Sequence, residues 1–409
     1  MELKRVVVTG LGALTPVGNN VAETWDNLVK GVSGAGPITH FDASKFKTHF
    51  ACEVKNFNGT DYIDRKELRK MDLYTQYAIA AAKEAVEDSG MDLEKEDLNR
   101  IGVIYGVGIG GIHTFEEEVA NYTLNKDTVG PKFNPFFIPK MIADIASGQI
   151  SIMYGFHGPN FTTTSACASS SNAIADAFNY IRLGKANVIV AGGAEAAIFE
   201  AGLGGFNAMH ALSTRNDDPE RASRPFSASR DGFVMGEGAG CLILEELEHA
   251  KARGVKIYAE LAGVGASADA YHLTASHPEG LGAKLVMLNA LEDAELKPEE
   301  RYTKRLEQAK PVLDALLAWA NDLIPRTAPK SALGKALHYL KEQWPYLVRY
   351  LEDGRLELSN NRAERSIKPF VMGRKGWLFS NTPAGAQASA VIYSLIETAK
   401  ENGLNPYQY

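Results

Sequence analysis

Two segments of different character are predicted along the 409 residues: an α/β protein over residues 1–300 and a mainly helical fragment over residues 301–409. In the first segment, short β-branched runs alternate with helical stretches, as is typical of buried sheets covered by helices. The charge changes at the same point. Residues 1–300 carry 27 Lys and Arg against 40 Asp and Glu, a net charge of −13, whereas residues 301–409 carry 16 against 10, a net charge of +6. Such a shift indicates two segments with different partners.

The elements of the first segment follow from its apolar periodicity. Strands are expected at Arg5–Gly10 (closed by Gly10-Leu11-Gly12), Ile101–Tyr105, Asn160–Thr164, Asn187–Val190, Gly238–Glu245 and Lys256–Gly263. Helices are expected at Val21–Lys30, Leu68–Ser89, Ser169–Leu183 and Leu281–Ala294. Gly90 and Gly184 are placed to end the second and third of these helices.

The second segment is expected to begin with two helices, Arg301–Leu323 and Leu333–Gln343, separated by Pro325 and Pro329. Beyond them the pattern predicts a turn within Leu347–Leu358, a polar stretch at Asn361–Ile367, a strand at Val371–Ser380 and a helix at Ala384–Glu401.

Composition excludes several classes of protein. With 45% hydrophobic and 23% charged residues, the chain is predicted to fold, and its three Cys argue against a disulfide scaffold and for the reducing cytoplasm. No apolar run is long enough for a membrane span. The apolar stretch Val6–Leu14 after Lys4-Arg5 could pass for a signal peptide, but Gly10, Gly12 and Pro16 interrupt it, so a strand and turn is expected.

Cys167 is the strongest candidate for chemistry. A β-branched run, Thr162-Thr163-Thr164, leads into small residues, and an amphipathic helix follows from Ser169. The Cys is therefore expected at a strand-to-helix turn, where free backbone N–H groups and the helix dipole favour a thiolate and can stabilise an oxyanion. The alternative is a buried, inert cysteine, which is the interpretation we give to Cys52 and Cys241 in their apolar runs.

Two other kinds of site find less support. The glycine-rich stretches, such as Gly106–Gly111, lack the third glycine or the acidic residue of a dinucleotide fingerprint, so tight turns and close backbone packing are expected instead. The nine His include no His-x-x-x-His pair, and the three Cys no Cys-x-x-Cys, so no metal site and no cofactor are predicted. In the tail, five basic residues flank Trp377 and Phe379, which suits either a weak phosphate or DNA contact or a solvated face; they are Arg362, Arg365, Lys368, Arg374 and Lys375.

Around Cys167 the first segment resembles the elongating type II β-ketoacyl-acyl-carrier-protein synthases, which are condensing enzymes of the thiolase fold. The resemblance rests on ordered motifs from Val7–Gly18 to Leu291–Ala294. Between these lie Gly106–Gly111, Ser165-Ala166-Cys167-Ala168-Ser169, Ala191–Glu195, Gly205–Met209, Ala211–Asp218, Arg224–Phe226 and Arg230–Gly238. The resemblance implies a layered αβαβα fold with a complete N-terminal half (residues 1–255) and a truncated C-terminal half (residues 256–300).

The resemblance also implies roles for particular residues. Cys167 would take an acyl group as a thioester, with its backbone N–H as one oxyanion donor. Ile109 and Phe206 match positions that line the acyl pocket, Thr274 matches a residue beside the pantetheine arm, and His272 one near the pocket mouth. The implied partners are an acyl-carrier protein bearing acyl and malonyl thioesters and a second copy of the chain in a homodimer.

Three features of that family are missing from this sequence. The family has two catalytic histidines: one opens a His-Gly-Thr motif, and the other follows a Lys-x-x-x-Gly spacing. It also has a Gly-Phe-Gly-Gly turn that supplies the second oxyanion donor. All three features would lie beyond Glu300. No His here is followed by Gly-Thr or preceded by Gly. The expected activity is therefore acylation on Cys167, as in fatty acid elongation, without condensation.

From Arg301 the sequence instead resembles the C-terminal end of an insertion-sequence transposase with an acidic catalytic triad. The matching stretches are Tyr350–Leu358, Asn360–Arg365, Pro369–Lys375, Trp377–Pro383 and Ser394–Gly403. The resemblance implies that Glu364 is the third acidic ligand of a two-metal site. The two aspartates that should precede it are replaced by synthase-like sequence. The single carboxylate that remains cannot hold two metal ions. The alternatives to an acylated enzyme are thus a non-functional fusion product and a DNA-binding remnant.

Overall fold

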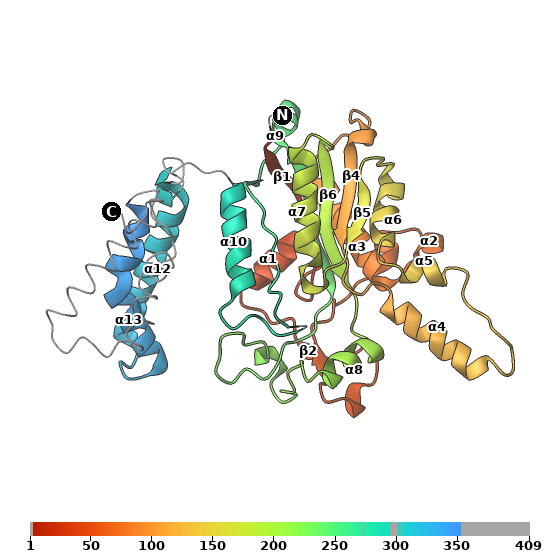
Figure 1. Cartoon of the computed structure of the whole chain (residues 1–409). Helices are drawn as coiled ribbons and strands as arrows, with labels where there is room; N and C mark the ends of the chain where they lie inside the picture. Colours follow the sequence, from red (N-terminus) through yellow and green to blue (C-terminus); the bar gives the residue numbers. More distant parts are fainter. Residues whose placement is uncertain (1–2, 273, 295–301, 304, 353–409) are drawn as a thin grey trace, which may run out of the picture. The chain divides into compact units, whose positions relative to one another are not determined.

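The computed structural model describes residues 3–272, 274–294, 302–303 and 305–352, and it divides into two compact units, Met1–Ala294 and Glu295–Tyr409. The first unit is built on a six-stranded mixed sheet in the order β5-β4-β6-β7-β1-β8, with a short β2-β3 pair beside it (Figure 1). Strands β5, β4 and β6 run parallel, and β7, β1 and β8 are antiparallel to their neighbours. The strands are β1 (Val6–Leu14), β2 (Gly36–Pro37), β3 (Phe50–Ala51), β4 (Ile101–Gly106), β5 (Asn160–Thr163), β6 (Val188–Glu195), β7 (Gly238–Glu246) and β8 (Ala259–Leu261).

Helices cover both faces of the six-stranded sheet. Because side chains alternate along a strand, β4 directs Val103 and Tyr105 into the core under α3 and α6, and Ile104 into the core under α7. The helices of this unit are α1 (Val21–Val29), α2 (Arg65–Leu68), α3 (Leu73–Asp88), α4 (Ile112–Asn125), α5 (Phe137–Met141), α6 (Ile145–Tyr154), α7 (Ser169–Arg182), α8 (Glu200–Ala208), α9 (Leu247–Arg253) and α10 (Leu281–Asp293). The predicted α/β class is confirmed.

Four predicted elements of the first unit differ clearly in their bounds from the structure. The strand predicted at Asn187–Val190 runs on to Glu195 as β6, and only Ala259–Leu261 of the strand predicted at Lys256–Gly263 forms β8. The first strand does not close at Gly10-Leu11-Gly12 but runs on to Leu14, because α3 packs directly against it. A Cβ at Gly10 would lie 2.2 Å from the carbonyl oxygen of Ala85, and a Cβ at Gly12 would lie 1.9 Å from the carbonyl oxygen of Ala81. Both glycines therefore allow the close packing of α3 on β1. The helix predicted as Leu68–Ser89 is two helices, since Asp72 caps the start of α3.

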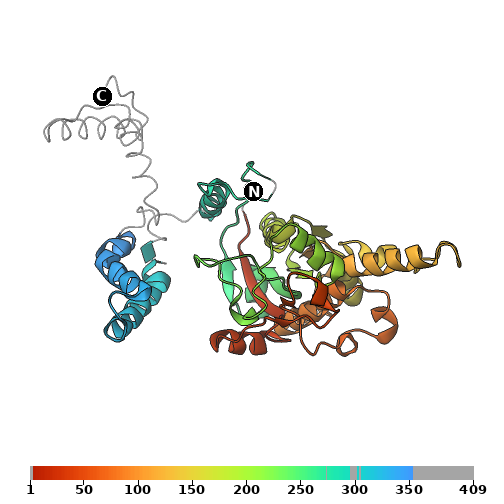
Figure 2. The same cartoon turned by 90° about the horizontal axis from the view of Figure 1, so that it is seen from below.

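Helices α4 and α5, which the sequence interpretation passed over, form an arm. In both views α4 extends away from the sheet (Figures 1 and 2). Aromatic rings hold the arm together: Phe133 stacks on Tyr122 and on Phe137, and Phe137 also stacks on Phe115. Several large apolar side chains of the arm remain exposed, among them Phe115, Leu124 and Ile138.

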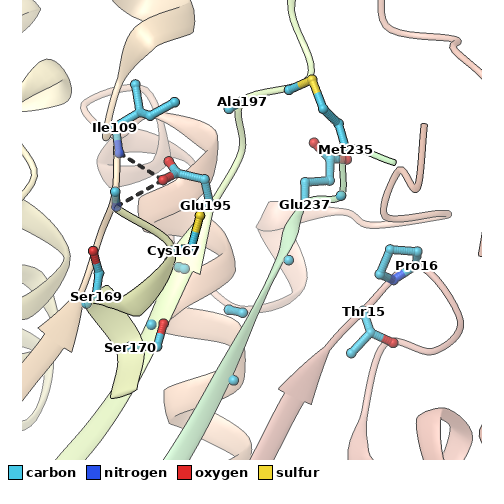
Figure 3. Close-up of a pocket in the computed structure, with 18 of the residues that line it drawn as sticks. Thr15, Pro16, Ile109, Cys167, Ser169, Ser170, Glu195, Ala197, Met235 and Glu237 are labelled. Atoms are coloured by element: carbon cyan, nitrogen blue, oxygen red, sulfur yellow. Dashed lines mark hydrogen bonds between the residues drawn. The ribbon is translucent and has the colours of Figure 1, made fainter. Parts of the chain in front are cut away.

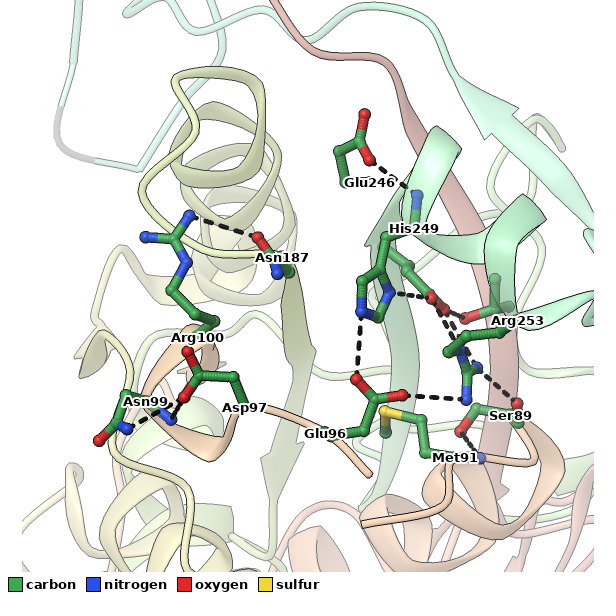
Figure 4. Close-up of polar contacts among 12 residues, drawn as sticks. Ser89, Met91, Glu96, Asp97, Asn99, Arg100, Asn187, Glu246, His249 and Arg253 are labelled. Atoms are coloured by element: carbon green, nitrogen blue, oxygen red, sulfur yellow. Dashed lines mark hydrogen bonds and ion pairs between the residues drawn. The ribbon is translucent and has the colours of Figure 1, made fainter. Parts of the chain in front are cut away.

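A buried ion network ties α9 to strand β7 and to the loop that precedes β4 (Figure 4). The Glu245 carboxylate, fully buried on β7, accepts hydrogen bonds from Thr9 Oγ1 at 2.7 Å and Arg253 Nε at 2.9 Å, and it contacts His249 Nδ1 at 2.6 Å. Glu96 meets the same two partners, His249 Nε2 at 3.1 Å and Arg253 Nη1 at 3.6 Å. The loop between α3 and β4 is thereby fastened to α9.

The described part of the second unit is helical, as predicted. A π-helical turn at Arg305–Ala309 leads into α12 (Lys310–Leu323), and α13 (Ala332–Leu347) follows after a 3₁₀ turn at Ile324–Arg326. The Ser331 hydroxyl caps α13 by accepting the Gly334 N–H at 3.0 Å. The elements predicted beyond Leu358 lie outside the described residues.

Candidate active site

Cys167 lies at a strand-to-helix turn, as the sequence predicts. Strand β5 ends at Thr163, a single 3₁₀ turn spans Ala166–Ala168, and α7 begins at Ser169. Ala166 has a φ of +50°, a left-handed conformation that costs free energy for a residue with a Cβ. The side chain of Cys167 is exposed, and the thiol is free. The turn therefore presents its sulfur at the N-terminus of a 14-residue helix, where unsatisfied N–H groups gather.

Hydrogen bonds of Ser169 hold this turn in shape. Its hydroxyl donates to the carbonyl of Ala166 at 2.7 Å and accepts the N–H of Ser165 at 2.9 Å. The Thr163 hydroxyl donates to the Ser169 carbonyl at 2.8 Å. The conformation on both sides of Cys167 is thus fixed by side chains within six residues of it.

Two glycines bring the start of α7 onto the ends of two parallel strands. A Cβ at Gly106, the last residue of β4, would lie 2.3 Å from the backbone nitrogen of Ser170. A Cβ at Gly193 on β6 would lie 1.9 Å from the Ser170 hydroxyl oxygen. No side chain fits between these strands and the helix, so the glycines set how deeply the Cys167 turn sits against the sheet.

A cavity of about 600 Å³ opens beside Cys167 (Figure 3). Ile109 and Phe206, the two residues expected to line an acyl pocket, both line it together with Cys167. Phe233 and Met235 contribute further apolar wall. The sequence therefore predicted three residues that the fold brings to one cavity, and its size suits a small apolar ligand.

The partly buried carboxylate of Glu195 shapes the side of the cavity that carries Ile109 (Figure 3). It accepts the backbone N–H groups of Gly108 at 3.0 Å, Ile109 at 2.8 Å and Gly110 at 3.3 Å. Burial raises the pKa of Glu195, and these three hydrogen bonds oppose the rise. The glycine-rich turn thus wraps a carboxylate of its own chain, which is the close backbone packing that the sequence predicts there.

Glu237 is a second carboxylate in the lining, and it is buried (Figure 3). Its Oε1 accepts hydrogen bonds from Val54 N–H at 2.9 Å and Tyr77 Oη at 3.1 Å, and it lies 3.0 Å from His40 Nε2. Among the residues that the structure describes, its other oxygen has no hydrogen-bond partner. Neither Glu195 nor Glu237 was singled out from the sequence, although each is an acidic residue amid glycine and alanine, a signal that could have marked them.

The other predicted site residues lie elsewhere. His272 and Thr274 sit in the loop before α10 and are not among the residues that line the cavity; there His272 Nδ1 accepts the N–H groups of Thr274 and Ala275, both at 3.1 Å. Glu364 and the basic residues around Trp377 lie outside the described residues. Their proposed roles stay predictions.

The remaining cysteines differ from Cys167 in burial. Cys241 is buried on β7, where loss of solvent raises the pKa of its thiol to about 12. Burial also raises the pKa of the Cys52 thiol. Among the described residues, no group of three or more His, Cys, Asp or Glu is arranged to hold a metal ion. None of the helices in the described part of the chain has both the length and the apolar character that a membrane span requires.

Each of the two segments matches a known protein family. Residues 3–250 match the family described as "Beta-ketoacyl synthase, N-terminal domain", and residues 273–388 match "Transposase IS66 family". The transposase match begins before the junction expected after Glu300. A 3-oxoacyl-[acyl-carrier-protein] synthase 2 of Staphylococcus aureus (strain COL) is 48% identical over 339 residues, which cover 83% of this chain and 79% of the relative.

Solved structures agree on the fold. A β-ketoacyl synthase from Burkholderia phymatum STM815 matches with a TM-score of 0.64 and 34% identity over 72% of this chain and 71% of that one. A ketosynthase solved with its type II polyketide acyl-carrier protein matches with a TM-score of 0.61 and 33% identity, covering 73% and 71% of the two chains. The chain therefore belongs to the β-ketoacyl synthase family, in a form whose C-terminal part matches an IS66 transposase.

Proposed function

We propose that the chain is a ketosynthase-like acyltransferase of fatty acid synthesis whose Cys167 accepts an acyl group from a carrier-protein thioester. The observation that carries the proposal is the exposed Cys167 sulfur at the start of α7, beside a cavity with apolar walls at Ile109 and Phe206. In the reaction the thiolate attacks the thioester carbonyl, and a carbon–sulfur bond to Cys167 forms as the bond to the carrier thiol breaks. The departing carrier thiolate takes up a proton from solvent.

An acyl-carrier protein is the proposed donor. Support comes from the matched structure of a ketosynthase in complex with its acyl-carrier protein and from the curated relative, whose name specifies an acyl-carrier-protein substrate. Ile109 and Phe206 would contact the acyl chain, and His272 and Thr274 would meet the arm that delivers it.

Condensation with a malonyl thioester is proposed to fail in this chain. Decarboxylation needs groups that stabilise the developing enolate, and such electrostatic stabilisation is commonly the largest contribution to catalysis. The described residues that line the cavity include two carboxylates, Glu195 and Glu237, and no histidine. The sequence also lacks the His-Gly-Thr motif of the family. The acyl-enzyme is therefore the expected end point.

Intact-protein mass spectrometry tests this proposal. After incubation with an acyl-carrier thioester, the full chain should gain one acyl group, which peptide mapping should place on Cys167. Cys167→Ala should gain none, and Cys52→Ala, a matched loss of another thiol, should be acylated like the original chain. Acylation that persists in Cys167→Ala would contradict the assignment.

A homodimer is the proposed assembly. Strand β5 lies at one edge of the six-stranded sheet, so its outer backbone groups are not paired within the described sheet. The α4–α5 arm exposes large apolar side chains that a second copy would cover, including Phe115, Leu124 and Ile138. Sedimentation equilibrium of the full chain measures the assembly directly, and a monomer at all concentrations would contradict the proposal.

A further inference from the structure

The wall of the cavity opposite the Ile109 turn is a glycine-flanked segment, Met235-Gly236-Glu237-Gly238. Gly238 has a φ of +141°, a conformation that side chains rarely allow, and Gly236 adds freedom on the other side. Two backbone hydrogen bonds tie the segment to Cys52: Cys52 N–H donates to the Met235 carbonyl at 2.8 Å, and Glu237 N–H donates to the Cys52 carbonyl at 3.1 Å. Gly238 also pairs with Glu195 at the start of β7, and Met235 packs in a buried apolar cluster. A further anchor, and the ionisable one, is the side chain of Glu237.

That anchor is a fully buried carboxylate with a second one nearby. The side chain of Glu237 has no exposed surface, and its Oε1 makes all of its hydrogen bonds. Glu53, also buried, accepts the Thr39 N–H at 2.8 Å and the His40 N–H at 3.3 Å. Two negative charges in one buried region are costly unless a positive charge accompanies them.

His40 is the side chain placed to supply this charge. Its Nε2 lies 3.0 Å from Glu237 Oε1, and its ring stacks on Phe199 at a centroid distance of 5.5 Å. His113 stacks on the same Phe199 at a centroid distance of 3.7 Å, but its Nε2 lies 3.4 Å from Glu117 Oε1. Both histidines border a second cavity of about 350 Å³, whose other charged lining residues are Asp72, Glu117 and Lys140.

We propose that His40 is a positioning residue for the acyl cavity: in its protonated form it holds Glu237, and through Glu237 it holds the wall segment 235–238 in the shape that receives an acyl chain. The inference concerns the same cavity as the proposed function and rests on it for the nature of the ligand. His40 itself is not among the residues that line that cavity.

The direction of the pH dependence follows from the contacts. The hydrogen bond to Glu237 raises the pKa of His40 above its ordinary value of 6.5, burial opposes the rise, and the charges of Glu237 and Glu53 add to it. Because this pKa is raised in the folded chain, the charged pair is fully present below pH 6.5 and is lost as the pH rises through the raised value. Acyl-chain binding should therefore weaken toward alkaline pH. The charged or titratable groups that face His40 or border its cavity are Glu53, Asp72, Tyr77, His113, Glu117, Lys140 and Glu237.

Equilibrium binding of a fluorescent long-chain acyl amide to the full chain, measured between pH 6 and 9, tests the inference. The probe is uncharged across this range and needs no reaction at Cys167, so the result is independent of acylation. Affinity should fall about tenfold from the acidic to the alkaline end, the scale of one hydrogen bond to a charged group. In His40→Gln the affinity should be low and constant with pH, because Gln can donate a hydrogen bond to Glu237 but carries no charge.

Two further variants separate the role of His40 from that of its neighbours. His113→Gln alters the other ring on Phe199 without touching Glu237 and should follow the original pH profile. Glu237→Gln removes the charge that His40 meets and should remove the pH dependence. Equal pH profiles for the original chain and His40→Gln would overturn the inference, as would probe binding that is absent at every pH. Acylation of Cys167, measured separately by mass spectrometry, decides the proposed function whichever result is obtained.

Discussion

Replacing Gly106 by Ala should move Cys167 without changing any group that takes part in the chemistry. The added Cβ would lie 2.3 Å from the backbone carbon of Ser169 and the backbone nitrogen of Ser170. Ordinary contacts between such atoms are near 3.5 Å, so the start of α7 must retreat by about 1 Å. Overpacking of this kind costs about 1–3 kcal/mol of stability.

The effect on acylation should be larger than the effect on folding. A displacement of about 1 Å at a reacting centre lowers rates by about a hundredfold, because the nucleophile no longer meets the carbonyl in line. The rate of acyl transfer to Cys167 from an acyl-carrier thioester, followed by mass spectrometry, measures this loss. Urea unfolding of the same variant shows whether it remains folded.

Gly148→Ala provides the matched control for Gly106→Ala. A Cβ at this position in α6 meets no atom within 4 Å, and Ala favours the helix. This variant should be acylated at the original rate with equal or greater stability. If Gly106→Ala were also acylated at the original rate, the close contact between β4 and α7 would not position Cys167, and the reasoning would be refuted.

Three further outcomes are expected. At pH 8 iodoacetamide should label Cys167 in the native chain and leave Cys241 unmodified, since burial raises the pKa of Cys241 to about 12; equal labelling, read by peptide mapping, would contradict this. Arg253→Met should lower the free energy of unfolding by about 3–5 kcal/mol in urea because Glu245 stays buried without that partner, and a loss near zero would count against the network. If the tail contacts DNA, replacing Arg362 and Arg365 by Ala should weaken a salt-sensitive affinity, and unchanged binding would remove that role.

The sequence predicted the nucleophile turn because its signals are local. A β-branched strand, a run of small residues and an amphipathic helix place Cys167 between β5 and α7 without knowledge of the rest of the fold. The strands β4 and β7 were equally well marked, since buried strands read as continuous apolar runs.

What the sequence did not predict depends on contacts between distant segments. Gly10 and Gly12 looked like the end of a strand, and only the approach of α3 shows why the strand continues through them. Helix α4 carries apolar residues at helical spacing, Ile112, Phe115, Val119 and Tyr122, which could have marked it as a helix. That it forms an arm depends on stacking of Phe115 and Tyr122 on rings of the following segment, which the sequence does not show. Glu195 and Glu237 are recognisable as supports of the cavity only once the residues they bind are folded around them.

The most direct test of the account supplies both substrates at once. The full chain, given an acyl-carrier thioester and then a malonyl-carrier thioester, should hold one acyl group on Cys167 and release no 3-oxoacyl product, as followed by mass spectrometry of both proteins. The Staphylococcus aureus relative, run in parallel, should release that product. Release of 3-oxoacyl product by this chain at a comparable rate, or no acyl group on Cys167, would contradict the account.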